Sequence, residues 1–289
     1  MERINNLVYR LKAVVRRFFR AKNKIALPPS NYELVKEYDL TQYNEKDWTY
    51  GPKWGEFHPK QLYVRYDMEG NTIQFNDNNV LKMAPRFEPK TYKKSDFPHW
   101  QQDMDVPDEF VIVHKTPRLH SVQAYRYGWF EAKIKLPKGK NLWPAYWLTG
   151  ANSWPPEIDM LEAYSKYDKN YGNKWGISSW KLQPNIHYGI VEQGSKGSTG
   201  AVDIPIYKAT EKFIHYACLW EEDRIEIYYD GRIAYECKDP EVLKWFNMGH
   251  NWMVIILSMG LCNEGKDIEY ATMEFKDVKV YQKKKNGNN

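Results

Sequence analysis

Three carboxylates stand close together in the segment Glu157-Ile158-Asp159-Met160-Leu161-Glu162. In an unbroken strand side chains alternate between faces, so Glu157 and Asp159 would share one face while Glu162 would point among the aliphatic residues. A buried carboxylate without a partner is costly. One extra residue at Met160-Leu161, accommodated as a β-bulge, returns Glu162 to the face of the other two. A row of carboxylates above an apolar base suits the cleavage of glycosidic bonds, which takes two carboxyl groups.

A helix is the alternative for the same segment. Ser153 could cap a helix that begins with Trp154-Pro155-Pro156, and Ile158, Leu161 and Tyr164 would then share one face. These residues alone leave both readings open, so the flanking sequence has to decide between them.

The flanking sequence favours a strand and predicts an all-β fold. Short β-like runs with turn residues between them occur at 127–137, 142–148, 213–220, 224–229, 233–236, 253–259 and 272–281. Asp230-Gly231 is a strong hairpin signal. Many short strands separated by turns predict a sandwich or a barrel.

Six segments resemble glycoside hydrolase family 16, and they follow one another in that family's order. They read YGWFEAKIKLPKG, LWPAYWLTG, WPPEIDMLEAY, IHYG, FIHYACLWEEDRIEIYYDG and MEFKDVKVYQ. The resemblance runs from about Ser30 to Gln282, and E-x-D-x-x-E is similar to the bulged, laminarinase- and galactanase-like branch. It implies a jelly-roll β-sandwich of the concanavalin A-like class. Many members carry an Asn and a Gly-Gly turn where this chain has Leu257-Ser258-Met259-Gly260-Leu261-Cys262.

The resemblance implies an endo-acting retaining β-glycanase that hydrolyses internal bonds of a polysaccharide, of β-1,3-glucan or β-galactan type, by double displacement. It assigns Glu157 as nucleophile and Glu162 as acid/base. Asp159 is expected to hydrogen-bond the nucleophile and, as a nearby negative charge, to keep Glu162 protonated. Transglycosylation uses the same glycosyl-enzyme and stays open. A carbohydrate-binding or structural protein on this fold, for example in a virion, is a further alternative, which the three intact carboxylates disfavour.

Aromatic and histidine side chains are the candidates for substrate binding. Trp143 and Trp147 are four residues apart on an expected strand, so they share a face, and the family places that face toward the cleft. Their flat rings suit stacking on sugars, although core packing is the alternative. Trp154 lies three residues before Glu157. His187 matches a cleft strand of the family, and His120 lies on another expected cleft strand.

No metal or other cofactor is predicted. Asp277 matches a position near a calcium site in some family members, but one aspartate does not define a site. Cys218, Cys237 and Cys262 form no C-x-x-C motif, so the sequence indicates neither a disulfide framework nor a zinc site. We expect these cysteines to be small core residues.

The basic charge is concentrated at the N-terminus. Residues 1–24 hold eight of the 42 Lys and Arg and one of the 37 Asp and Glu, which leaves 34 basic against 36 acidic residues elsewhere. A nearly neutral body does not predict a nucleic-acid groove. Apolar residues recur at helical spacing opposite these charges at Ile4, Leu7, Val8, Leu11, Val14, Val15, Phe18 and Phe19. We expect a basic amphipathic helix that docks on an anionic membrane, a partner helix or a larger assembly; its own sandwich is the alternative surface.

The expected domain boundaries follow from these patterns. Residues 1–29 are the helix and a Pro linker, residues 30–283 are the catalytic domain, and residues 284–289 are a polar tail. With 42% hydrophobic residues, the 289-residue chain can bury one large core. It shows neither a run of about 18 apolar residues nor the continuous apolar stretch of a signal peptide. The compartment therefore stays open, and an extracellular or cell-surface polysaccharide is the expected substrate.

Overall fold

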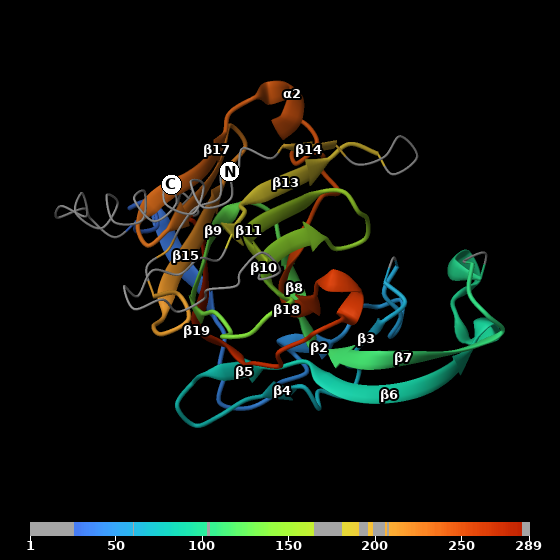
Figure 1. The fold of residues 1–289 in the computed structure, drawn as a ribbon. Coiled ribbons are helices and arrows are strands. Elements are labelled where there is room, and N and C mark those ends of the chain that lie inside the picture. Colours follow the sequence, from blue (N-terminus) through green and yellow to red (C-terminus); the bar gives the residue numbers. More distant parts are fainter. Residues whose placement is uncertain are drawn as a thin grey trace, which may run out of the picture.

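The computed structural model describes residues 26–59, 61–102, 105–164, 181–190, 196–198, 206 and 208–284. They form two large antiparallel sheets, A and B, packed face to face, and a smaller sheet C (Figure 1). The amphipathic helix predicted for residues 1–24 lies outside the described part of the chain. Of the helices in that part, none has the length and apolar character needed to cross a bilayer.

In the described part of the chain, sheet A has eight strands. Its order is β17 (Arg232–Cys237), β16 (Ile225–Tyr229), β15 (Ile214–Trp220), β9 (Gly128–Lys135), β19 (Met273–Lys283), β5 (Leu81–Met83) and β4 (Ile73–Gln74), with β1 (Tyr32–Glu37) also paired to β19. The predicted Asp230-Gly231 hairpin joins β16 to β17, and both residues have positive φ, 50° and 80°. This conformation matches the twist of the flanking strands.

Sheet B carries the carboxylate segment near its middle. Its order is β14 (Lys196–Ser198), β13 (Asn185–Tyr188), β11 (Glu157–Tyr164), β10 (Leu142–Gly150), β18 (Met253–Leu261), β8 (Arg118–Tyr125) and β2 (Trp48–Tyr50), with β12 (Lys181–Leu182) also paired to β11. The segment is therefore a strand, as predicted, and the helical alternative is wrong.

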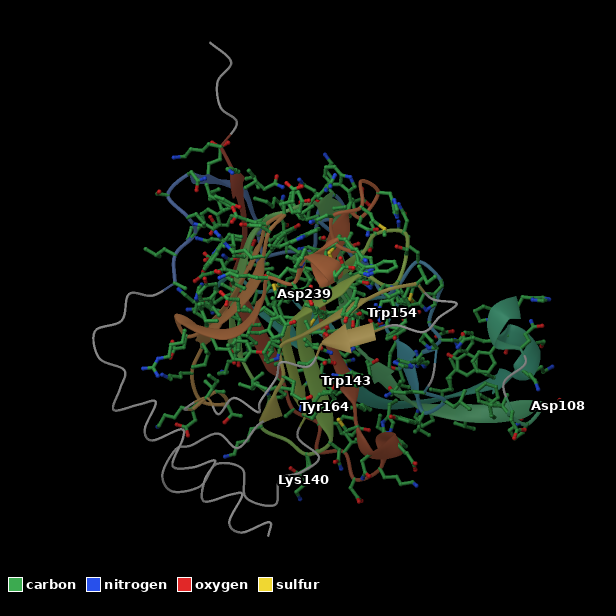
Figure 2. All side chains as sticks on the ribbon, turned by 90° about the horizontal axis from the view of Figure 1, so that it is seen from above. Asp108, Lys140, Trp143, Trp154, Tyr164 and Asp239 are labelled. Carbon is green, nitrogen blue, oxygen red and sulfur yellow. The ribbon has the colours of Figure 1, made fainter. Side chains whose placement is uncertain are left out.

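Sheet C adjoins sheet B at β8. It consists of β3 (Val64–Tyr66), β7 (Glu109–Thr116) and β6 (Arg86–Lys93), and the short helices η1 (Lys94–Asp96) and η2 (His99–Gln101) lie between β6 and β7 in the chain. The β6–β7 hairpin projects from the sandwich, and Asp108 marks its far tip, away from Trp143 and Trp154 (Figure 2). The short helices α2 (Pro240–Leu243) and η4 (Asn263–Gly265) precede and follow β18.

The core lies between sheets A and B. Alternate residues of each strand point inward, so Phe130 and Trp220 of sheet A share one apolar cluster with Tyr146, Ile158 and Leu257 of sheet B, all fully buried. Cys218, Cys237 and Cys262 are all buried, which confirms that they are core residues. Packing on one face of sheet B leaves its other face free to carry polar groups.

Candidate active site

The predicted bulge is present in β11. Asp159 pairs with Trp147 of β10, but the next pair along the strands involves Leu161, so Met160 is the extra residue. Met160 and Leu161 are both fully buried. The extra residue brings Glu162 back to the face of Asp159, and the aliphatic side chains stay in the core.

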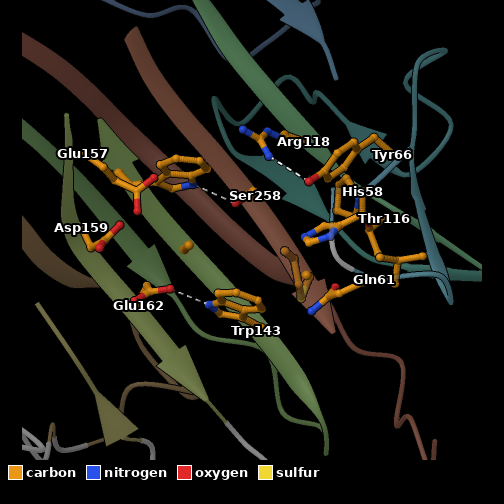
Figure 3. Close-up of a pocket in the computed structure, with 16 residues that line it drawn as sticks. His58, Gln61, Tyr66, Thr116, Arg118, Trp143, Glu157, Asp159, Glu162 and Ser258 are labelled. Atoms are coloured by element: carbon orange, nitrogen blue, oxygen red, sulfur yellow. Dashed lines mark hydrogen bonds between the residues drawn. The ribbon is translucent and has the colours of Figure 1, made fainter. Parts of the chain in front are cut away.

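A pocket of about 160 Å³ lies on this outer face of sheet B. Its floor crosses β11, β10, β18 and β8, a width of roughly 14 Å for three inter-strand gaps. The three carboxylates lie on one side, and Arg118, Tyr66 and His58 lie on the opposite side (Figure 3). The lining residues are His58, Gln61, Val64, Tyr66, Thr116, Pro117, Arg118, Trp143, Ala145, Trp147, Glu157, Asp159, Glu162, Ser258, Met259 and Gly260.

Glu157 and Glu162 are held by different donors. Oε1 of Glu162 accepts hydrogen bonds from Trp143 Nε1 at 2.9 Å and from the Tyr164 hydroxyl at 2.8 Å. Oε2 of Glu157 accepts one from Trp154 Nε1 at 3.0 Å. These donors lie on the neighbouring strand β10, on β11 itself and in the loop that precedes β11.

Burial raises the pKa of both groups, and the hydrogen bonds oppose it. For Glu157, burial and the negative charge of Glu162 raise the pKa to about 8, against the hydrogen bond from Trp154 and the charge of a nearby arginine. For Glu162, burial raises the pKa, while the donors Tyr164 and Trp143 favour the ionised form. The pKa of both carboxyl groups is therefore raised in the free site, and the two groups titrate as an interacting pair.

Asp159 is the most deeply buried of the three carboxylates. Its side chain is 3% exposed, and its Oδ2 atom has no hydrogen-bond partner among the described residues. Burial raises its pKa well above the ordinary value, and the charges of Glu157 and Glu162 add to this. The neutral form is therefore favoured in the free protein, whereas the sequence suggested a negative charge here.

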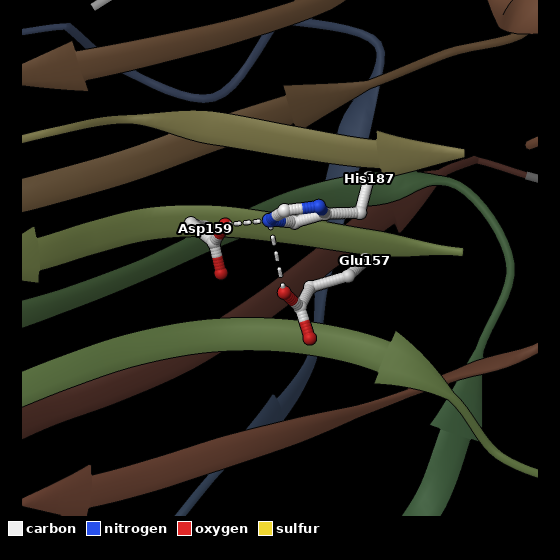
Figure 4. A group of neighbouring side chains, drawn as sticks. All are labelled: Glu157, Asp159 and His187. Atoms are coloured by element: carbon white, nitrogen blue, oxygen red, sulfur yellow. Dashed lines mark ion pairs between the residues drawn. The ribbon is translucent and has the colours of Figure 1, made fainter. Parts of the chain in front are cut away.

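His187 lies beside two of the carboxylates (Figure 4). Its Nε2 atom is 3.5 Å from Glu157 Oε1, 3.6 Å from Asp159 Oδ2 and 3.0 Å from Asn185 Nδ2. Glu157, Asp159 and His187 each offer one ligand atom, all within 4.8 Å of one another, a spacing that could admit a metal ion. The same spacing follows from the contacts of the His187 imidazole with the two carboxylates, without a metal ion. Asp277, which matches a position near a calcium site in some family members, forms an ion pair with Lys133 Nζ at 2.7 Å.

Arg118 forms the opposite wall and was not singled out from the sequence. Its guanidinium carbon lies 4.8 Å from the ring centre of Trp147 and 4.9 Å from that of Tyr66. Its Nη1 donates to the Tyr66 hydroxyl at 3.0 Å, and its Nε donates to His120 Nε2 at 2.7 Å. Burial, and then the charges of Arg118 and Lys53, hold the pKa of His120 well below its ordinary value. His120 therefore serves as a neutral acceptor that positions Arg118, and it does not line the pocket.

The two predicted tryptophans of β10 do share the pocket face. Trp147 Nε1 donates to Ser258 Oγ at 3.0 Å, which fixes its ring over the floor. Ser258 lies in the β18 segment where many members of the family carry an Asn. Trp143 lies against Gly260, where an added Cβ would lie 3.4 Å from the indole ring, an ordinary van der Waals contact.

Trp154 lies at the edge of the pocket. Its side chain is 39% exposed, and it borders a second hollow of about 210 Å³ together with Trp245 and His250. The structure thus brings together Glu157, Asp159, Glu162, Trp143 and Trp147 in the pocket, and it places Trp154 and His187 against the carboxylates. Tyr66 and Arg118 were missed because nothing in the sequence shows that sheet C adjoins β8.

Comparison with known proteins places this geometry in a family. Residues 63–274 match the family model of Glycosyl hydrolases family 16. The chain is 30% identical over 193 residues to Endo-1,3-1,4-beta-glycanase EglC of Rhizobium meliloti, covering 60% of this chain and 36% of that protein. It is 27% identical over 193 residues to a Glucan endo-1,3-beta-glucosidase of Cryptopygus antarcticus, covering 62% and 65%. The matched part thus spans little more than a third of EglC and under two thirds of the second relative.

Solved structures share the fold. LamAcat of Zobellia galactanivorans superposes with a TM-score of 0.65 at 22% identity, covering 86% of this chain and 97% of that one. The laminarinase catalytic domain of Thermotoga maritima gives a TM-score of 0.62 at 20% identity, covering 88% and 99%. The two-sheet arrangement is therefore the jelly-roll sandwich that the sequence predicted. The family-model match over most of the chain shows that this protein belongs to glycosyl hydrolase family 16.

Proposed function

We propose that this chain is an endo-acting β-glycanase that hydrolyses internal β-glycosidic bonds with retention of anomeric configuration. The observation that carries the proposal is the bulge at Met160, which sets Glu157 and Glu162 on one face of one pocket. Retaining enzymes need two carboxyl groups close enough for one to attack the sugar while the other protonates the leaving oxygen. Family membership and the names of the relatives support the same activity.

In the proposed reaction Glu157 attacks the anomeric carbon while Glu162 gives its proton to the leaving oxygen. Glu162 then takes a proton from water, and that water releases the sugar from Glu157. Burial raises the pKa of both groups, so the reaction needs Glu157 to ionise while Glu162 keeps its proton. A glycosidic oxygen beside Glu162 and growing positive charge at the carbon beside Glu157 both favour that state.

Asp159 acts as a hydrogen-bonding partner of the nucleophile in this scheme. Burial favours the neutral form of Asp159, which can donate a hydrogen bond to Glu157. A carboxylate oxygen of Asp159 lies within 4.8 Å of one of Glu157. A donor at this position stabilises the ionised nucleophile before attack and the carboxylate that leaves in the second step.

A neutral β-1,3- or mixed β-1,3-1,4-glucan is the substrate class that the pocket favours over a sulfated galactan. Trp143 and Trp147 offer aromatic faces for uncharged sugar rings. Among the described residues that line the pocket, Arg118 is the only Lys or Arg, and its Nη1 and Nε already donate to Tyr66 and His120. A sulfate group would need further cationic donors.

A carbohydrate-binding protein without catalysis is the second candidate. It is favoured by the similarity to a Beta-1,3-glucan-binding protein of Penaeus monodon, 31% identical over 138 residues, which cover 44% of this chain and 36% of that protein. The two candidates make different predictions, because a binding protein retains polysaccharide without releasing oligosaccharides.

A polysaccharide panel with product chromatography tests the proposal. We expect internal cleavage of laminarin or mixed-linkage glucan, loss of turnover by several orders of magnitude in Glu157→Gln and Glu162→Gln, and a milder loss in Asp159→Asn. Glu211→Gln, at an exposed ion pair with Lys208, is the matched control and should keep full activity. Full activity in Glu162→Gln would refute its acid/base role, and binding without products would favour the second candidate.

Transglycosylation stays a possible outcome of the same intermediate, and product analysis with added acceptor sugars distinguishes it from hydrolysis. The docking of residues 1–24 on a membrane, a partner helix or a larger assembly stays a prediction from the sequence, because these residues lie outside the described part of the chain.

A further inference from the structure

Strands β11 and β13 place four polar side chains in a square beside the pocket. Glu157 pairs with His187, and Asp159 pairs with Asn185, across the two antiparallel strands. Residues that pair directly, or that lie two apart on one strand, project from the same face of a sheet. All four side chains therefore share the face of sheet B that carries the pocket. The proposed reaction uses the two carboxyl groups of this square and gives no role to Asn185 or His187.

Two oxygen atoms of the square are buried without a partner. Asp159 is 2% exposed and Asn185 is 7% exposed. Neither Asp159 Oδ2 nor Asn185 Oδ1 has a hydrogen-bond partner among the described residues. Burying a polar atom unsatisfied is costly, so native structures ordinarily supply it with a protein group, a water molecule or an ion. Both oxygens carry lone pairs that suit a cation.

The imidazole of His187 contacts the two carboxylates at distances longer than hydrogen bonds. Its Nε2 atom lies 3.5 Å from Glu157 Oε1 and 3.6 Å from Asp159 Oδ2, whereas N–H···O bonds are about 2.7–3.2 Å long (Figure 4). Nε2 also lies 3.0 Å from Asn185 Nδ2. Because an amide nitrogen only donates, Nε2 is the acceptor in that contact and presents its lone pair to the square. An imidazole in this neutral state is the form that binds metals.

We infer that this square is a binding site for a divalent transition-metal cation such as Zn²⁺, and that the cation competes with the substrate. An imidazole nitrogen and carboxylate oxygens are ligands that zinc takes in proteins. A half-turn of the Asn185 amide exchanges its two terminal atoms and presents Oδ1 as a fourth ligand. The competition rests on the proposed function, in which Glu157 is the nucleophile, because a cation bound to Glu157 holds the enzyme inactive.

The distances in the square are close to those of zinc coordination. Zn–N and Zn–O bonds of about 2.1 Å in a tetrahedron set neighbouring ligand atoms about 3.4 Å apart. The separations from His187 Nε2 are 3.5 Å to Glu157 Oε1, 3.6 Å to Asp159 Oδ2 and 3.0 Å to the terminal amide atom of Asn185. The carboxylate oxygens of Glu157 and Asp159 lie within 4.8 Å of one another, so a small rotation of these side chains brings them to the same spacing.

A cation also compensates the negative charge that collects here. Burial, and then the charges of Glu157 and Glu162, raise the pKa of Asp159, and a divalent ion opposes these effects. The hydrogen bond from Trp154 occupies Oε2 of Glu157, and Oε1 is the atom that faces His187. The ion therefore takes the place of protons that the free site holds, without displacing the donor of the nucleophile.

Calorimetric titration of the full chain with ZnCl₂ tests the metal site without reference to activity. We expect one zinc ion to bind per chain and MgCl₂ to produce no binding, because Mg²⁺ takes oxygen ligands. Loss of a second-shell partner already lowers metal affinity about 10–100-fold, so loss of a ligand in His187→Ala or Asp159→Asn should lower it by more than about a hundredfold. His250→Ala, at an exposed histidine, is the matched control and should bind zinc as the wild type does.

The two ligand variants guard each other. Asp159→Asn keeps the shape of the side chain, so it carries the test if His187→Ala fails to fold. Unchanged zinc affinity in a folded ligand variant would mean adventitious binding elsewhere and would overturn the inference.

Steady-state kinetics on laminarin tests the competition. We expect ZnCl₂ to raise KM several-fold at constant kcat, and EDTA to restore the original value. Inhibition that a high concentration of laminarin does not relieve, or zinc binding without inhibition, would contradict competition at this site. If the chain hydrolyses no glucan, the proposed function fails while calorimetry still decides the metal site, so the two failures are distinguishable.

Discussion

The hydroxyl of Tyr164 is predicted to set the pH range in which the acid/base group works. It donates to Glu162 Oε1 at 2.8 Å, and its ring lies 5.2 Å from that of Trp143, so Tyr164→Phe removes the hydrogen bond and keeps the packing. The bond favours the ionised carboxylate, so its loss raises the pKa of Glu162. A hydrogen bond to a charged group contributes about 1.5–3 kcal/mol, and one pKa unit corresponds to about 1.4 kcal/mol. Because Trp143 still donates, we expect a rise of about one unit, the low end of this range.

The assay is the pH dependence of kcat/KM on a soluble oligosaccharide. A general acid has to be protonated, so the alkaline limb reports loss of the proton from the carboxyl cluster. In Tyr164→Phe this limb should move upward by about one pH unit, with little change on the acidic side. Tyr216→Phe is the matched control, because its buried hydroxyl has no hydrogen-bond partner among the described residues. An alkaline limb that stays in place, or moves downward, would refute the reasoning.

Three further predictions concern the strand, the nucleophile and the pocket floor. Deletion of Met160 removes the bulge and turns Glu162 into the core, so we expect loss of activity and a lower melting temperature, whereas Met160→Leu keeps both. Glu157 has a folded-state pKa of about 8 against an ordinary 4.5, so the native protein loses stability as pH rises between these values. In urea unfolding, Glu157→Gln should therefore be more stable than the wild type near pH 9 and equally stable near pH 4. An equal gain in stability at both pH values would contradict this. Trp147→Ala should raise KM roughly tenfold through loss of a stacking surface while Trp147→Phe has a smaller effect, and an unchanged KM would show that the ring does not bind sugar.

The sequence predicted the strand that carries the carboxylates and the bulge within it. The flanking β-like runs favoured a strand over a helix, and within a strand the period-2 pattern and the cost of burying Glu162 favoured a bulge. The two pocket tryptophans of β10 follow from the same period. These features depend on neighbours within a few residues, which a single sequence displays.

The opposite wall of the pocket depends on long-range pairing and was missed. Tyr66 reaches the pocket because β3 pairs in parallel with β7, and Arg118 faces it from β8, which pairs with β18 from the end of the chain. No local pattern reveals such partners. For the same reason the sequence placed His120 in the cleft, whereas it lies behind Arg118 as a hydrogen-bond acceptor.

The charge of Asp159 was also beyond local reasoning. The sequence shows a carboxylate between two others, and its ordinary chemistry is that of an anion. In the structure its side chain is 3% exposed and lies beside two further acids, so the neutral form is favoured. Burial of a particular side chain, which decides its protonation, is a property of the packed sheets.

The anomeric configuration of the first product formed tests the central claim most directly. Proton NMR during the first minutes of hydrolysis of a β-glucan resolves the α and β signals of the new reducing end before they equilibrate. If Glu157 is the nucleophile and Glu162 the acid/base group, the β signal appears first and the α signal follows through mutarotation. An initial α signal would mean direct attack by water, and it would contradict the assignment of Glu157 as nucleophile.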